Sequence, residues 1–174
     1  MDETPSPQPS PPAQAPASPP SAPLPEPVVV EHLPAAPDPS ALATLACERI
    51  ALTARERRYP RRRVTTDGGH VLVLALSQGR ALEPGTVLHV ARDWYAVLEA
   101  ALEPVLAVGP LATGDRIRLA HEVGGQHSDI ALDGEELLVP DDPVMMRVVC
   151  RLELPWKRAR RAFVPVSMGT PHAP

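Results

Sequence analysis

Proline placement divides this chain into a part that cannot form regular helices or sheets and a part that can. Fourteen of the 24 prolines precede Ser40, where each removes a backbone donor and fixes φ. The residues between them are mostly Ala and Ser with scattered acids, so little apolar surface offsets the entropy of ordering. The sequence therefore predicts a disordered Pro/Ala/Ser-rich tail over residues 1–40, in which Val28–Val30 is only a short apolar break.

Charge and cysteine content exclude several classes of protein. The net charge of −4 gives no general attraction to nucleic acid or to an anionic membrane. Cys47 and Cys150 lack CxxC spacing, which predicts reduced thiols. No apolar run approaches the roughly 20 residues needed to span a bilayer, and prolines from Pro5 onward interrupt any signal peptide. We expect a cytoplasmic protein without a membrane or nucleic-acid partner.

Strand-like patterning dominates the first half of the folded part. Residues 40–54 fit either a short helix or a strand. Asp67-Gly68-Gly69 is a hairpin signal, and apolar strand patterns separated by turns follow it at 71–76, 86–91 and 95–101. Short strands with turns every 8 to 12 residues are typical of a small sandwich or barrel. We expect an all-β domain over residues 41–102.

A basic run precedes these strands. Residues 55–63 read RERRYPRRR, with six arginines and one glutamate. Dense charge on an edge strand prevents edge-to-edge pairing, and this is the favoured interpretation. The alternative is an arm that binds nucleic acid, for which Tyr59 is the only interleaved aromatic residue.

A helical pattern begins after Gly109-Pro110. Thr113 or Asp115 is suited to cap a helix. We expect Gly124 to take the left-handed conformation just beyond its end. The residues expected to form its buried face are Ile117, Ala120 and Val123.

Two further signals complete the order of elements. Asp133-Gly134 separates apolar stretches at 130–132 and 136–139, as in a β-hairpin. Asp141 or Asp142, followed by Pro143, marks the start of a second helix. A last strand is expected over 157–164. The resulting β-α-β-β-α-β order predicts a ferredoxin-like domain over residues 103–166 and an α+β protein, with a flexible C-terminal tail at 167–174.

The histidine imidazoles are the only side chains in this sequence that clearly suggest a functional role, which is metal binding. Nucleophile elbows, phosphate-binding loops and zinc signatures are absent from it, so catalysis is not expected. His121 and His127 are six residues apart, which places them about 120° apart around a helix, too far to share one ion. His127 becomes part of a site if a two-fold axis brings its copy beside it. Nickel or zinc accepts such ligands.

Several segments resemble UreE, a family of urease accessory proteins that carry nickel. Ala120–His127 reads AHEVGGQH and is similar to the family's histidine-bearing segment. The resemblance continues at Arg61–Val64 and Glu103–Val108, and again at Val139–Met146 and Phe163–Gly169. It covers residues 55–172, which is all but the tail. The resemblance implies an N-terminal β domain, a ferredoxin-like domain, and a dimer formed through the latter.

The resemblance also implies a metal site. On this basis His127 is the principal Ni(II) ligand, His172 is a weaker one, and His121 and Gln126 support the site without binding the ion. Zn or Cu can substitute in vitro. Gly125 and Gln126 stand where the family has Asn and Arg, and a histidine-rich tail is reduced to His172, so we expect low metal capacity.

The function expected from this resemblance is delivery of Ni(II) by a homodimer to the urease assembly complex. Its partners would be the urease accessory GTPase and the urease apoprotein. Two alternatives remain open. One is a metal-free assembly or scaffold protein of the same fold, suggested by Gly125 and Gln126. The other is a nucleic-acid-binding protein that uses the basic run.

Overall fold

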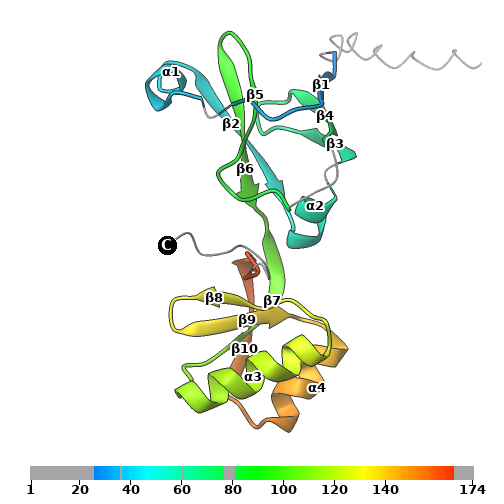
Figure 1. The fold of residues 1–174 in the computed structure, drawn as a ribbon, viewed down its shortest axis with the longest axis vertical. Coiled ribbons are helices and arrows are strands. Elements are labelled where there is room, and N and C mark those ends of the chain that lie inside the picture. The colour runs from blue at the N-terminus through cyan, green and yellow to red at the C-terminus, as the bar shows by residue number, and fades with distance from the viewer. Residues whose placement is uncertain (1–25, 36, 60, 77–80, 167–174) are drawn as a thin grey trace, which may run out of the picture.

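The protein has two domains, which meet where strand β6 leads into β7 (Figure 1). The computed structural model describes residues 26–35, 37–59, 61–76 and 81–166. The N-terminal domain consists mainly of strands, and the C-terminal domain combines a sheet with two helices. The α+β class and the expected pair of folds are thus confirmed. No helix in the described part of the chain is long and apolar enough to cross a bilayer.

The N-terminal domain is built from two three-stranded sheets. In order across the first sheet, the strands are β1 (Val28–Val30), β4 (Val71–Ala75) and β3 (Arg61–Thr65). Across the second they are β2 (Ala46–Leu52), β6 (Trp94–Ala100) and β5 (Val87–Val90). One apolar cluster joins both sheets, and its fully buried leucines are Leu72, Leu74, Leu88 and Leu98.

Three expectations for this domain need correction. The tail does not extend to residue 40, because β1 pairs in parallel with β4 and Val30 is 4 % exposed. Residues 40–54 contain helix α1 (Pro39–Leu42) as well as β2. The basic run is not a single edge strand, since its first half is helix α2 (Ala54–Arg58). For β1, burial of Val30 outweighs the local composition.

The C-terminal domain is ferredoxin-like. Its sheet has the strand order β10-β7-β9-β8, antiparallel throughout. The elements in chain order are β7 (Leu102–Val108), α3 (Thr113–Gly125), β8 (Ala131–Asp133), β9 (Glu136–Pro140), α4 (Pro143–Arg151) and β10 (Trp156–Ala162). Alternate residues of a strand face opposite sides. Leu106 and Val108 therefore pack with α3 and α4, while Val105 and Ala107 face the other side of the sheet.

Helix α4 follows its sequence signals closely. Asp142 is the N-cap, and its carboxylate accepts hydrogen bonds from the backbone N–H groups of Val144 and Met145 at 2.8 and 2.9 Å. Pro143 occupies the first turn, where a missing N–H costs nothing. The buried face consists of Met145, Val148 and Val149. This face covers one side of the sheet, so the second helix is placed as predicted.

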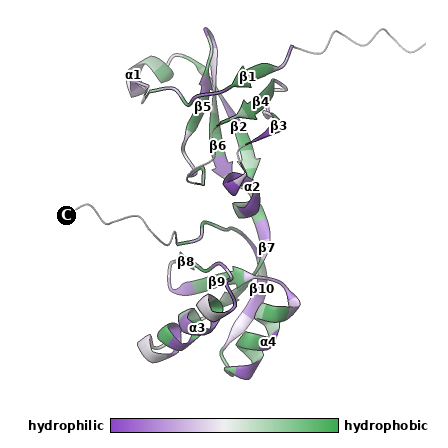
Figure 2. Ribbon diagram, turned by 45° about the vertical axis from the view of Figure 1, so that its right-hand side comes forward, coloured by the Kyte–Doolittle hydropathy of each residue, from purple (hydrophilic) through white to green (hydrophobic). Residues whose placement is uncertain are grey.

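Helix α2 lies at the junction of the two domains and is hydrophilic in Figure 2. Thr53 and Glu56 form a capping box at its start. Arg57 of this helix is only 4 % exposed. The backbone N–H of Ala54 donates to the Glu103 carboxylate across the junction at 2.7 Å. An arginine-rich helix is stable here because carbonyl and carboxylate oxygens bind its donors.

Candidate metal centre

His127 stands at the end of α3 in a left-handed backbone conformation. Its φ is +53°, and Gln126 is the residue that caps the helix. The His127 N–H donates to the Gly124 carbonyl at 2.9 Å, and the Ser128 N–H donates to the Val123 carbonyl at 3.1 Å. These two bonds form a Schellman motif with His127 at its left-handed position.

The expected position of this turn was wrong. We expected Gly124 to be the left-handed residue, but α3 continues through Gly125. Only at His127 does φ become positive. Leu119 and Val123 are the buried residues of α3, and packing them against the sheet keeps the helix intact past the double glycine. The turn is therefore made by a histidine, for which the left-handed conformation is less favourable than it is for glycine.

The His127 side chain is exposed. No hydrogen bond or ion pair to its imidazole occurs among the residues that the structure describes. The side chain is thus open to a ligand from solvent. Within the same residues no group of three or more His, Cys, Asp or Glu side chains is arranged to hold a metal ion. One chain therefore offers a single imidazole here.

The loop after His127 is held from two sides. The Asp129 carboxylate forms an ion pair with Arg58 of α2. The Ile130 carbonyl accepts a hydrogen bond from the Val166 N–H at 2.8 Å. The segment after β10 thus returns to the His127 loop at Val166, the last residue that the structure describes. His172 itself lies outside the described residues.

The other residues expected to support the site are His121 and Gln126, and their side chains do not bind His127. His121 is exposed on α3, and Gln126 is exposed at the cap. Neither side chain forms a hydrogen bond to the His127 imidazole in the described part of the chain. The next residue after His121, Glu122, pairs with Arg151 of α4. The structure does not bring the expected supporting residues together around the imidazole.

A row of small and apolar residues leads along α3 to this site. Ile117 is 64 % exposed, and Ala120 and Gly124 are also exposed. Their spacing of three and four residues places them on one side of the helix. The expectation that Ile117 and Ala120 are buried was wrong for the single chain, because Leu119 and Val123 face the sheet instead. This row is available for contact with another molecule.

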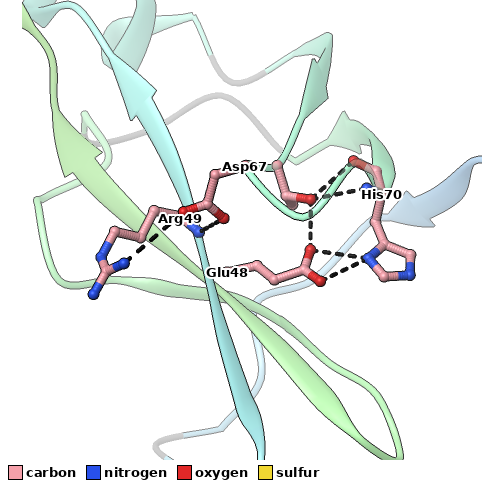
Figure 3. Close-up of polar contacts among 5 residues, drawn as sticks. Glu48, Arg49, Asp67 and His70 are labelled. Carbon is pink, nitrogen blue, oxygen red and sulfur yellow. Dashed lines mark hydrogen bonds and ion pairs between the residues drawn. The ribbon is translucent and has the colours of Figure 1, made fainter.

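His70 belongs to a polar cluster in the N-terminal domain (Figure 3). Its Nδ1 lies 2.9 Å from both carboxylate oxygens of Glu48. The Thr66 hydroxyl donates to the same carboxylate at 2.5 Å, and the His70 ring stacks on Trp94 at 4.1 Å between centroids. Glu48 is only 9 % exposed. This cluster binds the turn between β3 and β4 to β2, which accounts for His70 structurally.

His89 and His32 occupy a different part of the N-terminal domain. Both line an open hollow between β1 and β5 with a volume of about 680 Å³. Burial lowers the pKa of His89, whose ring also lies 5.3 Å from that of Trp94. Local sequence patterns do not reveal this hollow, because its walls come from two segments that are distant along the chain, residues 29–34 and 88–90.

Most arginines near the junction and on β10 have acidic or carbonyl partners. Arg62 pairs with Glu56 at 2.7 Å. On β10 the basic side chains pair with acids of neighbouring elements, namely Lys157 with Glu136, Arg158 with Asp141, and Arg161 with Asp133. These contacts neutralise much of the charge that suggested a nucleic-acid surface.

Comparison with known proteins identifies relatives of both domains. Residues 29–101 match the family model described as the N-terminal domain of the UreE urease accessory protein, and residues 103–173 match its C-terminal domain. The chain is 37 % identical over 114 residues to the urease accessory protein UreE of Deinococcus radiodurans, covering 66 % of this chain and 74 % of that protein. It is 31 % identical over 144 residues to the protein of the same name from Synechococcus sp. (strain WH7805), covering 80 % and 81 %.

Proposed function

The chain belongs to the UreE family of urease accessory proteins, and from this premise we propose that it carries Ni(II) to urease during assembly. The observation that carries the proposal is His127, an exposed imidazole held in left-handed geometry at the end of α3. Strained backbone at an exposed polar residue is a feature of functional sites. The ion is the cargo of this protein.

The proposed site is shared by two chains. One imidazole is too few for a transition-metal ion, and a two-fold axis supplies the second. The exposed row formed by Ile117, Ala120 and Gly124 ends beside His127. Pairing this row with its copy would bury apolar surface and bring the two His127 side chains toward the axis. The homodimer is thus proposed to form through the C-terminal domain.

His172 is proposed to add a further, weaker ligand. The Val166 N–H donates to the Ile130 carbonyl, three residues after His127. His172 follows Val166 by six residues in the chain. The tail therefore begins beside the site that it would complete. His121 and Gln126 are proposed only to support the site.

Transfer of the ion requires weak, exchangeable ligands. Few exposed imidazoles release nickel more readily than a closed thiolate site. Imidazole binds a metal only when neutral, so acidification should release the ion. We propose the urease accessory GTPase and the urease apoprotein as recipients, in the cytoplasm. Zn or Cu would occupy the same ligands in vitro.

Calorimetric titration with Ni(II) tests this function. The wild-type dimer should bind about one ion per two chains, and His127→Gly should abolish that step without disturbing the left-handed turn. His121→Ala is the matched control, since it removes an exposed histidine from the same helix. An unchanged isotherm for His127→Gly would remove His127 from the site.

Two other functions are tested by the same preparation. A metal-free scaffold would contain no nickel after purification without a histidine tag from nickel-supplemented medium. A nucleic-acid binder would show salt-dependent retention on a DNA or RNA column. The ion pairs of Arg58, Arg62 and β10 argue against the second of these.

A further inference from the structure

The sheet of the C-terminal domain is covered on one face by helices and on the other by residues from both domains. Helices α3 and α4 lie on the face turned away from the N-terminal domain (Figure 1). The second face packs with Ala54 of α2 and with Phe163, which follows β10. One residue from each domain therefore completes this second core. Its buried sheet residues are Val105, Ala107, Ala131 and Leu138.

Residues 163–166 form a strap across this second face. Phe163 follows β10, which is one edge strand of the sheet. The Val166 N–H donates to the Ile130 carbonyl at 2.8 Å, next to β8, the other edge strand. Phe163 is buried, whereas Val164 and Val166 are exposed. The strap is therefore held by one buried side chain and by hydrogen bonds of its backbone.

Arg57 of α2 binds this strap through a backbone carbonyl group. Its Nη2 donates to the Phe163 carbonyl at 2.6 Å, and its Nη1 donates to the Leu82 carbonyl of the N-terminal domain at 3.4 Å. Its Nε has no hydrogen-bond partner in the part of the chain that the structure describes. Because Arg57 is only 4 % exposed, solvent offers little replacement for a lost acceptor. The Phe163 carbonyl is thus the main group that offsets desolvation of the guanidinium.

The neighbouring ion pair between Arg58 and Asp129 is a weaker connection between the domains. The side chains of the two residues are 49 % and 29 % exposed, so solvent screens the attraction between their charges. The buried hydrogen bond of Arg57 should therefore contribute more to the contact between α2 and the C-terminal domain.

We propose that α2 and the strap form one latch between the domains, closed by the bond from Arg57 to Phe163, whose opening uncovers the second face of the C-terminal sheet. The two halves open together. Release of the strap leaves the Arg57 guanidinium buried with one long hydrogen bond, and movement of α2 removes Ala54 from the cluster that holds Phe163. Each movement makes the other less costly. Opening of such a unit requires less free energy than unfolding of the whole chain.

Hydrogen exchange of the full-length protein, followed by mass spectrometry, tests the latch. Arg57→Met keeps much of the aliphatic bulk and removes the donors. It should speed exchange about tenfold in peptides from both α2 and the strap, because loss of a buried hydrogen bond shifts an opening equilibrium by about this factor. Peptides from α4, on the opposite face of the sheet, should exchange at the wild-type rate. The measurement involves no metal and does not depend on the proposed function.

Phe163→Leu acts on the latch from the other domain. The carbonyl at this position remains, but leucine fills less of the cluster, so exchange in α2 should also become faster. Arg116→Met is the matched control for Arg57→Met. Arg116 likewise donates to two carbonyls, those of Leu111 and Glu135, each at 3.1 Å, but both belong to the C-terminal domain. This control should leave exchange in α2 and the strap unchanged.

Three results would overturn the latch. In Arg57→Met, faster exchange in α2 with a wild-type rate in the strap would show that the two halves open independently. Equal acceleration in α4 would show a loss of global stability instead, and equal acceleration in Arg116→Met would show that the junction is not special. If circular dichroism shows Arg57→Met to be unfolded, Phe163→Leu decides, and wild-type exchange in its α2 overturns the proposal.

Discussion

At the scale of single residues, conformational cost marks the proposed site. His127 occupies a left-handed position that is normally filled by glycine, although Gly124 and Gly125 lie three and two residues before it. An L-residue in this conformation costs about 1–2 kcal/mol. No hydrogen bond or ion pair of its side chain among the described residues offsets that cost. A histidine at this position agrees with the proposed role of His127 as a metal ligand.

His127→Gly should stabilise the metal-free protein by about 1 kcal/mol, because glycine adopts this geometry without strain. Urea unfolding in the presence of a chelator measures the change. His121→Gly is the control within α3, and it should destabilise by about 1 kcal/mol, since glycine in a helix increases the entropy lost on folding. If His127→Gly does not stabilise the protein, the left-handed turn is not strained.

Gly68 lies against the buried carboxylate of Glu48. A Cβ at this position would stand 2.2 Å from Glu48 Oε1, and that carboxylate is already bound by Thr66 and His70. Gly68→Ala should destabilise the N-terminal domain by about 1–3 kcal/mol through overpacking. Thermal unfolding followed by tryptophan fluorescence measures the loss.

Gly114→Ala is the matched control for this substitution, since nothing lies within 4 Å of its added Cβ. It should be neutral or stabilising by up to about 1 kcal/mol, because alanine lowers the entropy of the unfolded chain. Equal effects of the two substitutions would mean that Glu48 moves aside freely.

At the scale of elements, a capping box stabilises the start of the arginine-rich helix α2. The Glu56 carboxylate accepts hydrogen bonds from the Thr53 backbone N–H at 2.9 Å and from the Thr53 hydroxyl at 3.0 Å. The backbone bond, followed by the Thr53 hydroxyl and Arg62, lowers the pKa of Glu56 against the opposing effect of burial. This makes the stability of α2 dependent on pH.

The contribution of the Glu56 carboxylate to the free energy of unfolding should be fully present above the ordinary glutamate pKa of about 4.3. It should be lost as pH falls through the lower pKa of the folded state. The depressed value fixes this sign, because the folded state holds the proton less tightly than the unfolded one. Urea midpoints of wild type and Glu56→Gln at pH 6 and pH 3 measure it. The difference between the two urea midpoints should be large at pH 6 and small at pH 3. A difference independent of pH contradicts the lowered pKa of Glu56.

At the scale of the whole molecule, α3 presents apolar surface that its own chain does not cover. Ile117→Lys should convert a dimer into monomers, because a charge would then lie at the proposed two-fold interface. The fold should persist, since Ile117 is 64 % exposed. Light scattering after gel filtration measures the mass, and nickel bound per chain should fall with it.

Val29→Lys is the control for this prediction, because Val29 is 58 % exposed in the N-terminal domain, away from α3. It should leave the dimer intact. A dimer that survives Ile117→Lys would place the interface elsewhere and would leave the exposed row on α3 without a role in assembly.

Local signals in the sequence sufficed for the ferredoxin-like order. Asp142, Pro143 and the spacing of Met145 and Val148 predicted α4, because capping and one-sided burial are properties of adjacent residues. The hairpin around Asp133-Gly134 was also predicted from its turn residues, and Gly134 has a positive φ. The role of His127 as a metal ligand stays a prediction.

What the sequence by itself determined was the class of each strongly patterned element and the residue type available to bind a metal. Tertiary structure decided the rest. Packing of Leu119 and Val123 moved the end of α3 to His127, and pairing with β4 ordered Val28–Val30 despite the prolines around them. The burial of Arg57 depended on carbonyl groups 25 and 106 residues away in the chain. Such contacts are invisible locally, because their free energy arises only when distant segments meet.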